Sequence, residues 1–183
     1  MKKFKFLLLS ACIALVACTT KTSSEQQVSD KGTKWSWDKG TIVVETPERP
    51  AEQTSVIGLT IPKMEVVRVG FVGLGMRGPG AVERFTYIPG VEIVALCDYE
   101  KERAEKCQKY LQRASMPKAA IYSGEKGYEE LCKRDDIDLV YIATDWLHHF
   151  PVAMCAMENN KNVAIEVPSA MDLKECWALV NMS

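Results

Sequence analysis

From residue 66 to the end of the chain, short β-branched apolar runs alternate with longer segments of helical periodicity. The short runs predict strands at 66–72, 91–97, 119–122, 138–143 and 162–166. The longer segments predict helices at 78–88, 100–114, 124–134, 149–160 and 172–182. Strands that alternate with helices imply right-handed crossovers and a parallel sheet that is covered on both faces. The expected fold class is therefore α/β, with a doubly wound parallel sheet.

The first predicted strand runs directly into the glycine pattern G-x-G-x-x-G, formed by Gly73, Gly75 and Gly78. In a dinucleotide-binding turn, the first glycine permits the tight turn, the second lets the backbone approach the pyrophosphate, and the third lets the helix pack. Asp98 closes the next strand about 20 residues further on, where an acid accepts hydrogen bonds from the adenosine ribose. Because a carboxylate there repels a 2′-phosphate, the pattern predicts a Rossmann-type domain that binds NAD in preference to NADP.

The first 18 residues have a different pattern, with Lys2, Lys3 and Lys5 ahead of the apolar run 6–17. This run is too short for a permanent membrane span and predicts a signal peptide. Cys18, which follows a small residue, resembles the acylated cysteine of a bacterial lipobox, so residues 1–18 are expected to be a lipoprotein signal peptide. The alternative is an ordinary secretory signal followed by an incidental cysteine. In both cases the protein is exported, and the lipobox would anchor it to a membrane in the periplasm or at the cell surface.

Residues 19–62 are expected to be a tether and an N-terminal arm. Residues 19–34 are rich in Thr, Ser, Lys and Gln, which predicts a flexible tether, with ordered structure beginning near Trp35. The segment 41–45 could form a short strand or an arm that wraps the domain, and prolines at 47, 50 and 62 argue against a helix. Residues 63–183 then form the dinucleotide-binding domain.

In a doubly wound sheet, ligands bind at the carboxyl ends of the strands, so the residues that follow each strand are the candidates for chemistry. Met76 and Arg77 lie in the glycine turn, where Arg77 either faces the pyrophosphate or begins the helix in solvent. The second cluster follows the fourth strand and contains Trp146, Leu147, His148 and His149. The third cluster, Glu166 and Val167, follows the fifth strand.

The second cluster holds both histidines of the chain. A histidine here could line the nicotinamide pocket, or it could make only a structural hydrogen bond; Trp146 could line the pocket or belong to the core. Adjacent histidines diverge on a helix and no Cys or carboxylate set completes a ligand shell, so no metal site is expected. The five cysteines of the domain contain no C-x-x-C pair, and we expect them to be buried thiols: Cys97, Cys107, Cys132, Cys155 and Cys176.

Composition changes this picture little. The 183 residues are 47% hydrophobic and 26% charged, as in a globular domain, and the net charge of −1 gives no indication of a nucleic-acid partner.

Four segments together resemble the Gfo/Idh/MocA oxidoreductases in order and spacing: V-R-V-G-F-V-G-L-G at 67–75, A-L-C-D at 95–98, D-L-V-Y-I-A-T at 138–144 and K-N-V-A-I-E-V-P at 161–168. Most members of that family have Glu-Lys-Pro in the last segment, with a lysine regarded as catalytic. Here Val167 stands in place of that lysine, and a valine cannot transfer a proton.

This departure, together with Gly78-Pro79-Gly80, the 145–149 segment and the lipoprotein start, resembles glycoside hydrolase family 109, the NAD-dependent α-N-acetylgalactosaminidases. The resemblance implies a glycoside substrate with terminal N-acetylgalactosamine, cleaved by oxidation, elimination, water addition and reduction, with NAD recycled. It also implies cofactor contacts at Met76, Arg77, Asp98, Trp146 to His149, Glu166 and Val167.

The acid-base tyrosine and histidine of family 109 lie in a second domain, so the chain is expected to be a fragment, truncated before that domain and inactive alone. Two alternatives remain from the sequence. One is an NAD-dependent sugar dehydrogenase of the wider family, and the other is a non-catalytic NAD-binding module on a lipid anchor. A homo-oligomer is also left open.

Overall fold

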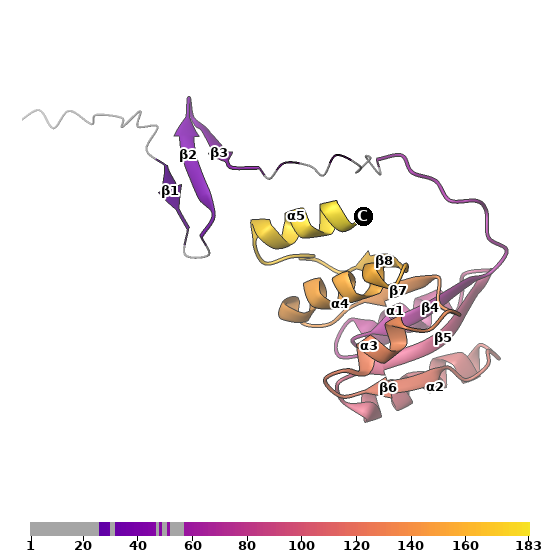
Figure 1. Cartoon of the computed structure of the whole chain (residues 1–183). Helices are drawn as coiled ribbons and strands as arrows, with labels where there is room; N and C mark the ends of the chain where they lie inside the picture. Colours follow the sequence, from indigo (N-terminus) through magenta and orange to yellow (C-terminus); the bar gives the residue numbers. More distant parts are fainter. Residues whose placement is uncertain (1–25, 30–31, 47, 49–50, 52–56) are drawn as a thin grey trace, which may run out of the picture. The chain divides into compact units, whose positions relative to one another are not determined.

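The computed structural model describes residues 26–29, 32–46, 48, 51 and 57–183, and the chain divides into two units between Glu45 and Thr46. Figure 1 shows the course of the chain through both units. The predicted signal peptide, its lipidation site Cys18 and much of the predicted tether lie outside the described residues. Each unit is described by itself.

The first unit contains an antiparallel sheet of strands β1 (Gln27–Val28), β2 (Lys34–Asp38) and β3 (Thr41–Val44), in the order β1-β2-β3. Lys39 and Gly40 join β2 to β3 with φ angles of 47° and 84°, which is the geometry of a two-residue hairpin turn. The expectation that ordered structure begins near Trp35 was wrong. Gln27 pairs with Trp35 across the sheet, and this backbone pairing does not depend on the polar composition that suggested a tether.

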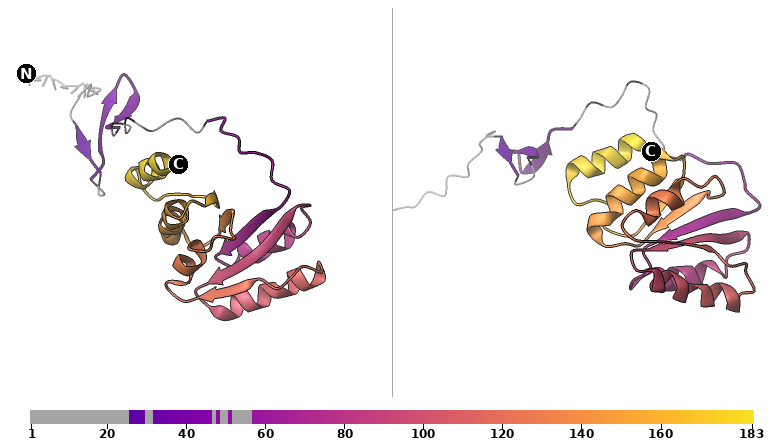
Figure 2. Two further views of the ribbon diagram at one scale, coloured as in Figure 1. Left: turned by 45° about the vertical axis from the view of Figure 1, so that its right-hand side comes forward. Right: turned by 60° about the horizontal axis from the view of Figure 1, so that its bottom comes forward.

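The second unit is built on five parallel strands in the order β6-β5-β4-β7-β8. The strands are β4 (Val67–Val72), β5 (Val91–Asp98), β6 (Ala120–Ser123), β7 (Leu139–Ile142) and β8 (Asn162–Ile165). The helices are α1 (Gly78–Phe85), α2 (Lys101–Arg113), α3 (Gly127–Cys132), α4 (Trp146–Glu158) and α5 (Leu173–Met182). The first strand of this sheet along the chain is the central β4. The chain then moves outward through β5 to β6 and returns on the other side of β4 to β7 and β8. This order confirms the predicted doubly wound sheet (Figure 2).

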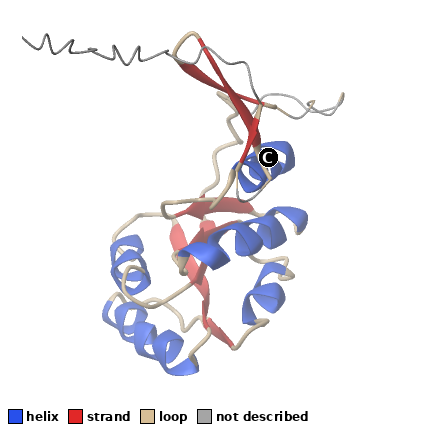
Figure 3. Cartoon of the chain, turned by 90° about the vertical axis from the view of Figure 1, so that its left-hand side faces the viewer, coloured by secondary structure: helices blue, strands red, loops and turns tan. Residues whose placement is uncertain are grey.

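The sheet is covered on both faces, as Figure 3 shows. Phe71 and Leu96 pack in a core with residues of α1 and α2, whereas Val140 and Ile142 pack in a second core with residues of α3 and α4. Successive strand residues point to opposite faces, so β4 contributes Phe71 to the first core and Val72 to the second.

Several predicted helix ends were wrong. Helix α4 begins at Trp146 rather than at 149, because the Asp145 side chain caps it by accepting a hydrogen bond from Leu147 N at 3.0 Å. A helix that began at 149 would have Pro151 in its first turn, where proline is tolerated. In the structure, Pro151 lies inside the helix. Helix α1 ends at Phe85 rather than at 88, because the next residues form i→i−3 hydrogen bonds.

The five cysteines of this unit are free, and Cys97, Cys107 and Cys132 are buried as predicted. Burial raises the pKa of the Cys97 thiol to about 12. The prediction was wrong for Cys155, which is half-buried, and for Cys176, which is exposed on α5, a helix with no buried residue. Across the described part of the chain, no helix combines the length and apolar character needed to cross a membrane.

Candidate cofactor site

Packing requires glycine at two of the three glycine positions of the turn. Gly73 has a φ of 91°, and a Cβ there would overlap the backbone of Ala143 and Thr144 at the end of β7. A Cβ on Gly78 would overlap the carbonyl oxygen of Gly73. Gly73 N also donates to Cys97 O of β5 at 2.9 Å, so both strands that flank β4 hold the turn in place.

Gly75 has no such packing reason. It is exposed, and the only heavy atom of the described residues within 4 Å of a Cβ there, apart from its chain neighbours, is Arg103 Nη1 at 3.7 Å. The space above Gly75 is therefore open to a ligand. An open approach to the second glycine, directly before α1, fits the pyrophosphate of a dinucleotide.

Asp98 lies beside this turn and is only 6% exposed. Its Oδ2 accepts a hydrogen bond from Leu74 N at 2.6 Å, and its Oδ1 accepts one from Glu100 N at 2.9 Å. The carboxylate therefore joins the glycine turn to the loop that follows β5. Its predicted contact with the adenosine ribose stays a prediction.

Arg103, in the first turn of α2, is a residue that the sequence reasoning missed. Its Nη1 lies 3.6 Å from Asp98 Oδ1, and the side chain lines a cavity of about 450 Å³ together with Gly75, Met76 and Lys106. The signal that could have found it is a cationic residue five positions after the acid of the fingerprint. Arg103 brings positive charge to the edge of the glycine turn, where the phosphates of a dinucleotide are expected.

Met76 and Arg77 are both exposed at the end of the turn, with Met76 91% exposed. The carbonyl oxygen of Arg77 accepts a hydrogen bond from Ala81 N at 3.2 Å, which begins α1. This placement is compatible with both predicted roles of Arg77, facing the pyrophosphate or beginning the helix in solvent.

The second cluster forms the first turn of α4. Trp146 is 60% exposed and Leu147 73% exposed, so the alternative that Trp146 belongs to the core was wrong. His148 is also exposed, and its Nδ1 lies 2.7 Å from Asp145 Oδ2. Partial burial raises the pKa of Asp145, but the hydrogen bond and charge of His148 outweigh it, so the net pKa is lowered.

His149 lies on the other side of the helix and is 1% exposed. Its Nδ1 is 2.7 Å from the carbonyl oxygen of Pro168, an atom that can only accept, so Nδ1 carries the proton and donates. Its Nε2 is buried and has no hydrogen-bond partner among the described residues. This is the arrangement expected from the structural alternative, and contact of His149 with nicotinamide stays a prediction. Within the described ranges, no three His, Cys, Asp or Glu residues gather as metal ligands.

Glu166 and Val167 follow β8. The Tyr141 hydroxyl of β7 donates to Glu166 Oε1 at 2.7 Å, and Val167 is 82% exposed. Burial and the hydrogen bond to Glu166 raise the pKa of Tyr141. Sequence reasoning missed Tyr141, because its partner is known only once the register of β7 and β8 is fixed.

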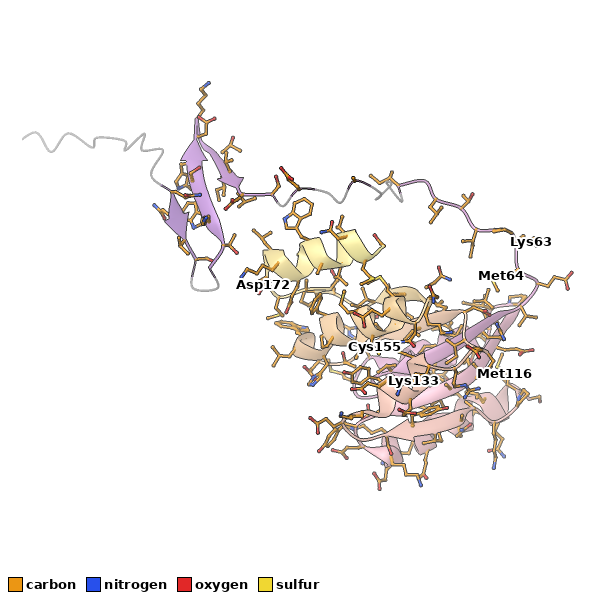
Figure 4. The ribbon with its side chains drawn as sticks, viewed as in Figure 1. Lys63, Met64, Met116, Lys133, Cys155 and Asp172 are labelled. Atoms are coloured by element: carbon orange, nitrogen blue, oxygen red, sulfur yellow. The ribbon has the colours of Figure 1, made fainter. Side chains whose placement is uncertain are left out.

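The glycine turn, the second cluster and the third cluster follow the carboxyl ends of β4, β7 and β8, and Asp98 is the last residue of β5, so these residues gather at one edge of the parallel sheet. In Figure 4, Met64 and Met116, which precede β4 and β6, lie at the opposite, amino-terminal edge. The geometry therefore brings the glycine turn, Asp98 and the second and third clusters to the edge where doubly wound sheets bind nucleotides.

Comparison with known proteins supports the same conclusion. Residues 67–183 match the Gfo/Idh/MocA family, described as "Oxidoreductase family, NAD-binding Rossmann fold". Among solved structures, the domain is similar to myo-inositol dehydrogenase from Lactobacillus casei in complex with NAD(H) and myo-inositol. The TM-score is 0.56 at 27% sequence identity, over 64% of this chain and 33% of that one.

Among curated proteins, the chain is 74% identical over its full length to glycosyl hydrolase family 109 protein 5 of Phocaeicola vulgatus, of which it covers 35%. It is 57% identical over 98% of its length to glycosyl hydrolase family 109 protein 1 of Bacteroides thetaiotaomicron, of which it covers 37%. The chain thus spans about a third of the length of these relatives. The resemblances seen in the sequence are confirmed: the chain belongs to the Gfo/Idh/MocA oxidoreductase family, whose NAD-binding Rossmann fold it carries.

Proposed function

We propose that this chain is the NAD-binding part of a glycosidase that cleaves α-N-acetylgalactosaminides. The observation that carries the proposal is the 74% identity, over the whole chain, to a relative named as a glycosyl hydrolase of family 109. Val167 supports it, because this exposed position carries the catalytic lysine in most dehydrogenases of the wider family. A valine leaves that position without a proton donor or acceptor.

The residues of the chain have separate tasks in this proposal. Backbone N–H groups of the glycine turn and of the first turn of α1 bind the pyrophosphate, with Met76 and Arg77 beside it, and Asp98 accepts hydrogen bonds from the adenosine ribose. The exposed first turn of α4, with Trp146, lies along the nicotinamide half. Bound NAD would supply the oxidising and then the reducing capacity at the sugar.

We further propose that the protein is exported and anchored through acylated Cys18. The support is the sequence pattern of residues 1–18: lysines, then an apolar run, then a small residue before cysteine. Growth with a radiolabelled fatty acid tests this proposal. Label is expected on the wild-type protein, and label that persists in Cys18→Ser would contradict it.

The activity test uses the protein that contains this segment, supplied with an α-N-acetylgalactosaminide that releases a coloured aglycone. We expect aglycone release that requires bound NAD but accumulates no NADH, because the cofactor is restored in every turnover. No release under these conditions would contradict the proposal.

An NAD-dependent sugar dehydrogenase is the second candidate, and the likeness to a myo-inositol dehydrogenase at 27% identity favours it. Net formation of NADH from NAD and a free sugar, without glycoside cleavage, would establish that candidate. Binding of NAD with neither reaction would instead indicate the non-catalytic module.

A further inference from the structure

We propose that Tyr141 and His149 are positioning residues that clamp the turn Glu166–Pro168 from opposite faces of the sheet and thereby set the nicotinamide end of the cofactor site. The inference rests on the proposed function, because it takes NAD as the ligand.

The clamp on the first face is the Tyr141 hydroxyl, which donates to Glu166 Oε1 at 2.7 Å. The Tyr141 ring packs against Phe71 and Phe85, with ring centroids 5.2 and 5.3 Å apart. These contacts belong to the core that α1 and α2 cover. The aromatic cluster fixes the ring, so the hydroxyl is presented to the carboxylate from a fixed position.

The clamp on the second face is His149 of α4, which packs with α3 against the other side of the sheet. Its Nδ1–H donates to Pro168 O at 2.7 Å, and the ring is 1% exposed. With the proton on Nδ1, the buried Nε2 can remain a bare lone pair, whereas an Nε2–H would be a buried donor without a described partner. The hydrogen bond to Pro168 O therefore favours one tautomer of His149 and at the same time holds the turn in place.

Between these two side chains, the backbone of the turn is tied to the sheet, because Glu166 N donates to Ile142 O at 3.0 Å. Hydrogen bonds thus hold the residues on either side of Val167, while Val167 itself is 82% exposed. A rigid turn presents Val167 in one place at the carboxyl edge of the sheet. Such preorganisation lowers the ordering cost of binding a ligand at this position.

The test compares two nucleotides on the full chain: NAD, and ADP, which has the adenosine end but no nicotinamide. Tyr141→Phe keeps the packed ring and removes only the donor. We expect it to weaken NAD by up to about tenfold, because the turn must then be ordered when the nicotinamide end binds, and to leave the ADP affinity unchanged. Tyr87→Phe, at a tyrosine that is 74% exposed, is the matched control and should bind both nucleotides as the wild type does.

A second pair of variants addresses the other face. His149→Ala removes the donor to Pro168 O and should weaken NAD selectively. His149→Asn places an amide N–H near the position of Nδ1 and should restore NAD binding, a rescue that a role of bulk alone would not produce.

Unchanged NAD binding in both Tyr141→Phe and His149→Ala would overturn the clamp while leaving the proposed NAD binding intact. Equal weakening of NAD and ADP would also overturn it, because that result indicates a general loss of structure. A wild-type chain that binds ADP but not NAD would contradict the proposed function itself.

Discussion

The carboxylate Oδ2 of Asp98 accepts a hydrogen bond of 2.6 Å from the backbone N–H of Leu74, which lies between two glycines of the turn. Its Oδ1 accepts a second bond, from Glu100 N. The acid of the fingerprint is thus a brace for the glycine turn, in addition to its proposed contact with the ribose. One buried side chain would thus couple the shape of the glycine turn to the predicted preference for NAD.

Asp98→Asn should change both the stability of the protein and its preference for NAD, and the two changes can be measured separately. An asparagine has one acceptor oxygen, so one of the two backbone donors loses its partner, at a cost of about 1–3 kcal/mol in the free energy of unfolding. Loss of the negative charge should also reduce the preference for NAD over NADP, because the 2′-phosphate is no longer repelled. Chemical denaturation and the two dissociation constants measure these effects. Glu102→Gln, an exposed charge of α2, is the control, and an unchanged NAD-to-NADP ratio in Asp98→Asn would contradict the prediction.

Gly75→Ala should abolish cofactor binding without unfolding the protein. Among the described residues the added Cβ meets only Arg103 Nη1, at 3.7 Å, which is ordinary contact, but it occupies the space assigned to the pyrophosphate. Gly78→Ala is the contrast, because its Cβ would overlap Gly73 O and should lower the melting temperature as well. Circular dichroism and NAD titration distinguish the two. Normal NAD binding by the Gly75→Ala variant would show that the pyrophosphate lies elsewhere.

The sequence was informative where one local signal determines the structure. The β-branched strand and glycine pattern at 67–78 located β4, the turn and the start of α1, because Gly73 and Gly78 each answer a local steric demand. The alternation of strands and helices sufficed to predict a doubly wound parallel sheet, since crossovers are right-handed.

Long-range partners were not accessible in the same way. Tyr141 looked like an ordinary strand residue, and only the register of β7 and β8 brings its hydroxyl to Glu166. The sequence left His149 open between lining a pocket and making a structural hydrogen bond, and only the fold shows that its Nδ1 lies against Pro168 O.

The ion pair that joins β4 to β7 should make stability depend on pH. Arg68 Nε and Nη2 lie 2.9 and 2.6 Å from the two carboxylate oxygens of Asp138, and these hydrogen bonds lower the pKa of Asp138 in the folded state. The stabilisation is therefore complete above the unfolded pKa, about 4, and is lost as the pH falls through the lower folded value. Asp138→Asn should lower the melting temperature at pH 7 and flatten its decline in acid. Asp135→Asn, at an exposed carboxylate, should do neither, and parallel profiles for wild type and Asp138→Asn would contradict this account.

Trp146 should report cofactor binding by fluorescence. It is 60% exposed in the first turn of α4, and the proposed course of NAD brings the nicotinamide half beside it, where it would quench the indole. Addition of NAD should therefore lower the tryptophan emission of the wild type, and Trp146→Phe should lose most of that decrease. Trp177→Phe, at the half-buried tryptophan of α5, is the matched control and should keep it. If Trp146→Phe retains the full decrease while NAD still binds, the nicotinamide half does not pass along α4, and its place must be sought elsewhere at the carboxyl edge of the sheet.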